Sequence, residues 1–141
     1  MDYFIVELNN DQKIAIPLDK VQEVMSISYN DICPIPGVKE SLLGIVSQRG
    51  NLLWLLDLSR LLYNFRLLNN SYSSSTILVT KLEENYIGLV VKKLGEIKDL
   101  VLDNSFDVSQ QNAINSHNNF CVNTKNSIAI IDLIQIENYL K

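Results

Sequence analysis

The sequence predicts a mainly β fold made of two similar small β-barrels that form one domain. Short segments rich in β-branched and aromatic residues recur at close spacing along its 141 residues, which is typical of small all-β domains. The second half of the chain repeats the pattern of the first. We therefore expect one domain over residues 1–141, with halves near 1–70 and 71–141; an exchange of strands or helices between them stays open.

The composition excludes some classes of function. Hydrophobic residues make up 47% of the chain and charged residues 20%, which is ordinary for a soluble globular domain. The net charge of -4 offers no basic surface to phosphates, so we expect no nucleic-acid partner. Neither a signal peptide nor an apolar run near the roughly 18 residues of a membrane span is evident. We expect a cytoplasmic protein without direct membrane insertion.

The first elements are strands. Residues 3–8 and 13–16 are strand-like and flank the turn-forming residues 9–12, so they predict a hairpin that ends at Pro17. The spacing of three between the apolar residues of 18–24 predicts a short helical turn.

The next stretch begins irregularly, because Pro34, Pro36 and Gly37 follow one another closely. Residues 38–46 predict one or two helical turns that lead into a strand, and residues 49–51 predict a tight hairpin turn. The continuous apolar run 52–56 predicts a strand buried on both faces. Asp57 then stands where a carboxylate caps a short helix over 58–62.

The second half continues in the same manner. Residues 69–75 are polar and are the best linker candidate, whereas 76–80, 86–91 and 128–131 predict strands and the polar residues 110–119 a loop. Residues 132–140 predict a C-terminal helix with one apolar face, and Asp132 with Gln135 resembles a capping box.

An internal repeat connects the two halves. Residues 3–27 align without a gap on residues 76–100, and the two hairpin turns coincide in that alignment. Residues 55–58 match 130–133, so both Asp57 and Asp132 stand between a strand and a helix. Any two hairpins share alternating apolar residues, but the later strand–Asp–Leu–helix block recurs at nearly the same offset. The repeat therefore predicts two similar β subdomains.

Residues that could carry chemistry are scarce. The single histidine, His117, lies in a polar stretch, and no nucleophile elbow or glycine-rich phosphate loop occurs. Cys33 and Cys121 lack metal-like spacing, so we expect free thiols in a reducing compartment, with a disulfide between them left open. Asp57 ends a run that resembles a metal-holding strand, but the repeat gives it and Asp132 a simpler role as helix caps. We expect no catalytic residue, no cofactor and no metal.

A potential contact surface remains around two charged residues. Glu23 and Arg49 lie on either side of the Pro-rich stretch, and arginine is favoured at interfaces because its planar group carries several donors. The simpler interpretation of Arg49 is that it decorates a hairpin turn. For Trp54, inside the apolar run, core packing is favoured over a ligand role.

Four blocks of the sequence resemble the CheW-like adaptor family of bacterial chemotaxis. They are, in chain order, Lys20-Val21-Gln22-Glu23-Val24, Gly44-Ile45-Val46-Ser47-Gln48-Arg49-Gly50, Leu55-Leu56-Asp57-Leu58 and Ile87-Gly88-Leu89-Val90-Val91. The resemblance covers nearly the whole chain. It implies two five-stranded β-barrel subdomains with short helices and a C-terminal helix, in agreement with the repeat.

The resemblance also implies a function. Such proteins are not enzymes and bridge a CheA-type histidine kinase to the tip of a methyl-accepting chemoreceptor, which would recruit the chain to membrane receptor arrays. Arg49 falls at the arginine of the family's Asn-Leu-Arg-Gly-like motif, implicated in receptor coupling, and Gly50 follows it. Val21, Glu23 and Gly44 fall at other positions associated with coupling. These five residues are the protein-binding candidates.

The sequence departs from the family pattern at three places. Ser47-Gln48 replaces the usual Asn-Leu or Asn-Trp, Lys92 replaces a common aspartate, and Trp54 stands where many members have proline. The segment 54–58 looks more like cyanobacterial members, which serve phototaxis and pilus-based motility, so a photoreceptor is a second receptor candidate. The alternatives are an orphan binding module that regulates pilus or other motility machinery, a small-barrel enzyme and a nucleic-acid-binding barrel.

Overall fold

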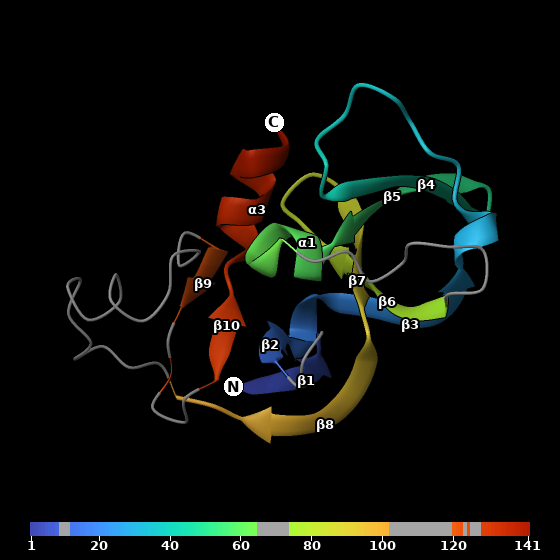
Figure 1. Ribbon diagram of the computed structural model, residues 1–141. Helices are drawn as coiled ribbons and strands as arrows, with labels where there is room; N and C mark the ends of the chain where they lie inside the picture. The colour runs from blue at the N-terminus through green and yellow to red at the C-terminus, as the bar shows by residue number, and fades with distance from the viewer. Residues whose placement is uncertain (9–11, 65–73, 102–119, 123, 125–127) are drawn as a thin grey trace.

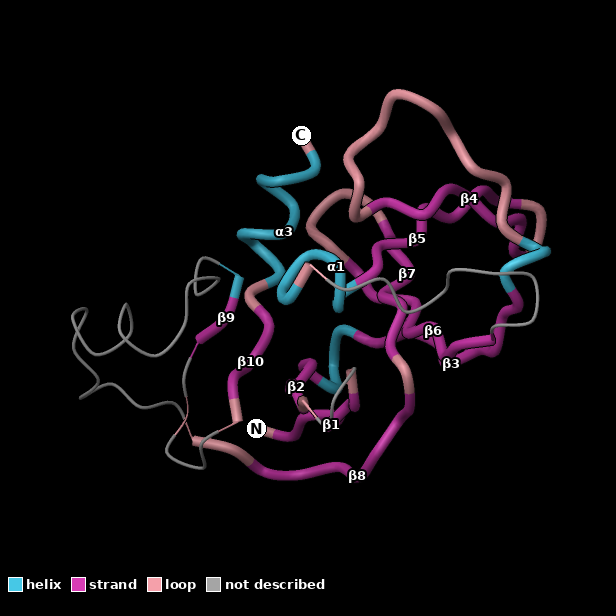
Figure 2. Tube along the Cα trace, in the orientation of Figure 1, coloured by secondary structure: helices cyan, strands magenta, loops and turns pink. Residues whose placement is uncertain are grey.

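The computed structural model describes residues 1–8, 12–64, 74–101, 120–122, 124 and 128–141. The described part of the chain is mainly β, with two five-stranded sheets and two short α-helices, which confirms the predicted fold class (Figure 1). In Figure 2 the strands form two groups, and α1 lies between them.

The elements follow one another twice in the same order. The first series is β1 (Asp2–Glu7), β2 (Lys13–Pro17), β3 (Val21–Ser28), β4 (Leu42–Gln48), β5 (Asn51–Asp57) and α1 (Leu58–Tyr63). The second series is β6 (Ser74–Lys81), β7 (Tyr86–Val91), β8 (Lys93–Asp99), β9 (Cys121–Val122), β10 (Ala129–Ile131) and α3 (Leu133–Leu140). Two 3-10 helices flank β3, at Leu18–Lys20 and Tyr29–Asp31.

Each sheet combines strands from both series. The first sheet has the order β8-β1-β2-β10-β9, and the second has the order β3-β6-β7-β5-β4. In the first sheet the β1–β2 hairpin lies between β8 and β10 of the second series. In the second sheet the β6–β7 hairpin lies between β3 and β5 of the first series. The parallel contacts correspond as well, because Ala15 pairs with Ile130 in the first sheet and Gly88 pairs with Leu55 in the second. These pairs occupy equivalent places in the sequence repeat.

The largest apolar cluster lies where the two sheets meet. It joins Val6 and Ile14 of the first sheet to Leu78 and Leu89 of the second, and Leu62 of α1 enters the same cluster. All five side chains are at most 1% exposed. A second cluster fills the interior of the second sheet, around Leu55, Ile77 and Val90. The first cluster therefore holds the two sheets together.

Both predicted helix caps are present. The Asp57 carboxylate accepts a hydrogen bond from the Arg60 amide, and the Asp132 carboxylate accepts from the amides of Ile134 and Gln135. The reciprocal half of a capping box is absent at Asp132, whose own amide donates to the Phe120 carbonyl. The two aspartates satisfy amides that no helix can satisfy internally.

Three element predictions are wrong. The helical turn over 18–24 ends at Lys20, because Val21 already begins β3 and pairs with β6. Residues 38–41 form no helix and β4 begins at Leu42, because the Pro-rich segment is held against the edge of β4 by a bridge between Cys33 and Ile45.

The third wrong prediction concerns residues 52–56 of β5, which were expected to form a strand buried on both faces. Leu52 and Trp54 are exposed, because β5 pairs with β7 only from Leu55 onward and the face that carries them is open.

The remaining predictions fall partly outside the described residues. These are the turn at 9–12, of which residue 12 is described, the loop at 110–119 with His117, and the linker at 69–75, whose last two residues begin β6. Cys33 is exposed and Cys121 is buried, and both are free thiols. A disulfide between them is therefore not formed.

Candidate protein-binding site

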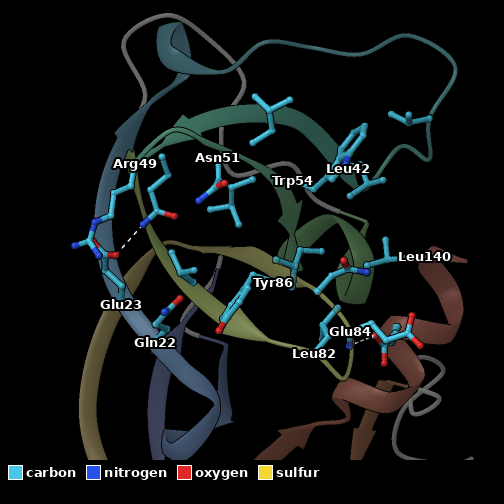
Figure 3. A pocket seen from close by; sticks show the side chains of 18 of the residues that line it. Gln22, Glu23, Leu42, Arg49, Asn51, Trp54, Leu82, Glu84, Tyr86 and Leu140 are labelled. Carbon is cyan, nitrogen blue, oxygen red and sulfur yellow. Dashed lines mark hydrogen bonds and ion pairs between the residues drawn. The ribbon is translucent and has the colours of Figure 1, made fainter.

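Side chains connect the two edge strands of the second sheet. Glu23 in β3 faces the end of β4, where Gln48 Nε2 donates to Glu23 Oε1 at 2.7 Å and Arg49 Nη2 donates to Glu23 Oε2 at 3.1 Å. The second contact is also an ion pair. We call this three-residue arrangement the Glu23 latch (Figure 3). It engages both carboxylate oxygens and fixes the β4–β5 turn against β3.

Arg49 occupies a backbone conformation that arginine seldom adopts. Arg49 and Gly50 form a two-residue turn between paired Gln48 and Asn51, and their φ angles are 52° and 82°. Two positive φ angles are typical of a type I′ hairpin, where Asn and Gly are preferred. The Arg49 side chain is 75% exposed. The turn therefore presents a guanidinium at the surface, at a conformational cost that is common at functional sites.

The latch stands at one end of a groove of about 920 Å³. The walls of the groove come from β3, the β4–β5 hairpin, the β6–β7 hairpin and the last turns of α3. Figure 3 shows Arg49 and Glu23 at one end and Trp54 and Leu140 at the other, with Tyr86 between them. The groove thus has an ion pair at one end and large apolar side chains at the other.

Large apolar side chains line this groove without being covered. Leu52 is 72% exposed, Tyr86 45% and Trp54 38%, and all three belong to its lining. Aromatic side chains are enriched where proteins bind one another, because they bury a large area and lose little conformational entropy. The exposed apolar face of β5 and β7 is therefore a candidate contact surface.

A buried carboxylate also belongs to the groove. Glu137 of α3 is 8% exposed and accepts hydrogen bonds from the backbone amides of Glu83 and Glu84 at 3.4 and 3.5 Å. Both distances exceed those of ordinary amide hydrogen bonds. Glu137 fastens α3 to the β6–β7 turn, and the Tyr139 hydroxyl, 2.7 Å from the Ser41 hydroxyl, fastens the helix to the segment before β4.

The structure separates the five candidate residues into two groups. Glu23 and Arg49 line the groove, whereas Val21, Gly44 and Gly50 do not. Val21 packs against the largest apolar cluster, and Gly50 provides the second residue of the turn.

Gly44 has φ 143°, and a Cβ atom there would lie 2.2 Å from the Cys33 carbonyl oxygen. Its absence of a side chain lets the Cys33 segment pack on the edge of β4.

Apart from Glu23 and Arg49, the groove residues were not predicted as site residues. Gln48 was noted only as a departure from the family pattern, and Leu52 and Trp54 were assigned to a buried strand. An alternation of apolar and polar residues would have indicated that one face of β5 is exposed. Residues 52–56 are all apolar, so the sequence carries no such alternation. No sequence signal distinguishes Glu137 from a solvated helix residue.

The described residues contain no group of three or more His, Cys, Asp or Glu side chains placed to hold a metal ion. None of their helices is long and apolar enough to cross a membrane.

Comparisons with known proteins agree on the fold. The family model described as CheW-like domain matches residues 2–137. The crystal structure of scaffolding protein TtCheW from Thermoanaerobacter tengcongensis is similar, with a TM-score of 0.68 and 20% sequence identity over 94% of this chain and 88% of that one. No curated protein matches the sequence.

Proposed function

The chain belongs to the CheW-like domain family, and from this premise we propose that it is a non-enzymatic adaptor. It couples a CheA-type histidine kinase to a methyl-accepting chemoreceptor or photoreceptor, in chemotaxis, phototaxis or pilus-based motility. Membership of this family supports the general adaptor role, while the particular partners and their place in receptor arrays belong to the proposal.

The observation that carries the proposal is the position of Arg49. Its guanidinium is exposed beside an open groove, and the Glu23 latch and a type I′ turn hold it there. An adaptor needs a surface that partners can reach without unfolding it, and this arrangement supplies a rigid charged group next to exposed apolar side chains.

The mechanism is scaffolding. One sheet of the adaptor packs against a similar barrel of the kinase through apolar contacts, and the groove receives the helical tip of the receptor. Arg49 and the exposed side chains of Leu52 and Tyr86 contact that tip, while Val21, Gly44 and Gly50 maintain the shape of the surface around it.

Replacement of Arg49 by asparagine tests the proposal. Asparagine tolerates the positive φ of the turn, so Arg49→Asn removes the guanidinium with a change in unfolding free energy of less than about 1 kcal/mol. We expect the tagged variant to recover at least fivefold less kinase and receptor from the native cell than the wild type. Lys98→Ala, which removes an exposed cation on β8, is the matched control. Undiminished recovery of both partners by Arg49→Asn contradicts the assignment.

One observation favours the second candidate, an orphan module that binds motility machinery without a chemoreceptor. Gln48 replaces an apolar residue of the family's motif and donates to Glu23 at 2.7 Å, so the surface beside Arg49 is more polar here. The same recovery experiment separates the two functions. A kinase and receptor among the bound proteins favour the adaptor, and motility components alone favour the orphan module.

A further inference from the structure

We propose that the Trp54 end of the groove is a pocket for an arginine side chain of the docked protein. This inference rests on the proposed function, because it names the chemistry of the segment that enters the groove. It concerns Glu137, Leu140 and Trp54, which neither the sequence pattern nor the family resemblance assigned to binding. The pocket lies at the opposite end of the groove from Arg49 (Figure 3).

The first argument is the incomplete satisfaction of Glu137. The residue is more than nine-tenths buried, yet the described residues provide its carboxylate only two long hydrogen bonds and no ion pair. Burying a carboxylate is costly unless strong donors compensate for the lost water. A guanidinium would supply charge-assisted donors to the same oxygens, which are shorter and stronger hydrogen bonds than the two long amide contacts.

The second argument is the apolar surface beside this carboxylate. Leu140 follows Glu137 by three residues and therefore lies on the same face of α3. Leu140 and Trp54 share one end of the groove (Figure 3). The aliphatic stem of an arginine can pack on Leu140, and its weakly hydrated planar head suits this partly apolar lining better than a strongly hydrated ammonium does.

The third argument is the sign of the charge. Glu84 and Glu137 line this end together with one cation, Lys141, so the pocket is net acidic. Arg49 at the other end is already paired with Glu23. An incoming basic side chain is therefore directed toward Glu137 rather than toward the latch.

The chain offers a direct measurement, because Trp54 is its only tryptophan. The full chain is titrated with the peptide Ac-Leu-Arg-Leu-amide while Trp54 fluorescence is recorded. The control peptide has citrulline in place of arginine, which keeps the shape and removes the charge. We expect a saturable change with the arginine peptide and an apparent affinity at least tenfold weaker with the citrulline peptide. Equal responses to the two peptides overturn the proposal and indicate apolar docking only.

A variant then assigns the effect to Glu137. Glu137→Gln keeps an oxygen that can accept from the same two amides, and we expect it to lose the arginine preference. Glu83→Gln and Lys98→Gln, which change charges outside the groove lining, are matched controls that should retain it. A preference for arginine that survives Glu137→Gln overturns the assignment. So does a fluorescence change that depends on the protein concentration and not on the peptide, because it would indicate a second copy of the chain in the groove. The wild-type peptide comparison stands even if Glu137→Gln is unstable.

This titration and the recovery of partners from cells fail independently. If the arginine preference is absent while kinase and receptor still bind in an Arg49-dependent way, the pocket is wrong and the adaptor function stands. If the preference is present while neither partner is recovered, the pocket stands and the adaptor function is wrong.

Discussion

At Gly44, backbone conformation and crowding act together. Its φ of 143° is rare for residues with a side chain, and a Cβ atom would lie 2.2 Å from the Cys33 carbonyl oxygen. We expect Gly44→Ala to lower the free energy of unfolding by at least about 2 kcal/mol, because backbone would have to shift. Urea unfolding measures the loss.

Gly37 provides the matched control for this substitution. It also has a positive φ, 83°, but nothing lies within 4 Å of a Cβ atom built there. Gly37→Ala should therefore cost only the conformational strain, about 1 kcal/mol. Equal losses for the two variants would show that the Cys33 contact does not matter. A larger loss at Gly44 would assign this residue a structural role in packing the Cys33 segment on β4.

The two cysteines should differ sharply in reactivity. Burial raises the pKa of the Cys121 thiol to about 12, with a smaller contribution from the Asp132 carboxylate, whereas Cys33 is exposed. At pH 8 we expect a disulfide reagent to modify one thiol rapidly in the folded chain and the second only after unfolding. Cys33→Ser should abolish the rapid reaction. Rapid modification of two thiols in the folded chain would contradict the burial of Cys121.

The Cys121 thiol also determines how the free energy of unfolding changes at high pH. The unfolded chain releases this proton near pH 9, the ordinary value, while the folded chain retains it up to about pH 12. The folded state therefore binds more protons over this range, and its free energy of unfolding falls as the pH rises. Cys121→Ala should make this fall shallower between pH 9 and 11 in urea unfolding curves, and an unchanged slope would contradict the assignment.

At the scale of elements, the caps show how local chemistry places the helices. Asp132 accepts hydrogen bonds from two amides at the start of α3. Asp132→Ala should destabilise the protein by about 1 kcal/mol, and Asp132→Asn by only a few tenths, because asparagine caps nearly as well. Thermal unfolding of the two variants checks this. A similar loss in both would attribute the effect to charge rather than to capping.

The sequence predicted elements well where local chemistry decides them. The turn at Arg49 and Gly50, the strand at Tyr86–Val91 and both aspartate caps are confirmed. The wrong predictions concern residues whose structure or burial is determined by contacts with residues far away in the sequence. Val21 and Val24 have a helical spacing, but pairing with β6 makes them a strand. Whether Trp54 is buried depends on where β5 meets β7, which a single apolar run does not reveal.

At the scale of the whole molecule, the repeat predicted two similar units, while their construction depends on pairing between distant strands. Each sheet takes a hairpin from one series and three strands from the other. Local pattern cannot specify this exchange, since a hairpin has the same alternation whichever neighbours it finds. The candidate site shows the same limit. Glu23 and Arg49 were identified from their places in the sequence and then from the resemblance, but their contact and the position of Glu137 emerge only from the assembled sheets.

The exchange predicts that neither half is stable alone. In a fragment of residues 1–64, β3 lacks β6, and β5 lacks β7, because both missing strands lie between them in the second sheet. The hairpin of β1 and β2 likewise lacks β8 and β10, and isolated hairpins are marginal in water.

We expect fragments 1–64 and 74–141 to be unfolded separately and to form a folded heterodimer when mixed. Circular dichroism and sedimentation measure this, with the intact chain as the reference. A fragment that unfolds cooperatively on its own would mean that the exchanged strands are dispensable. Folding only upon mixing would show that the interface between the sheets and the groove beside it form in a single step.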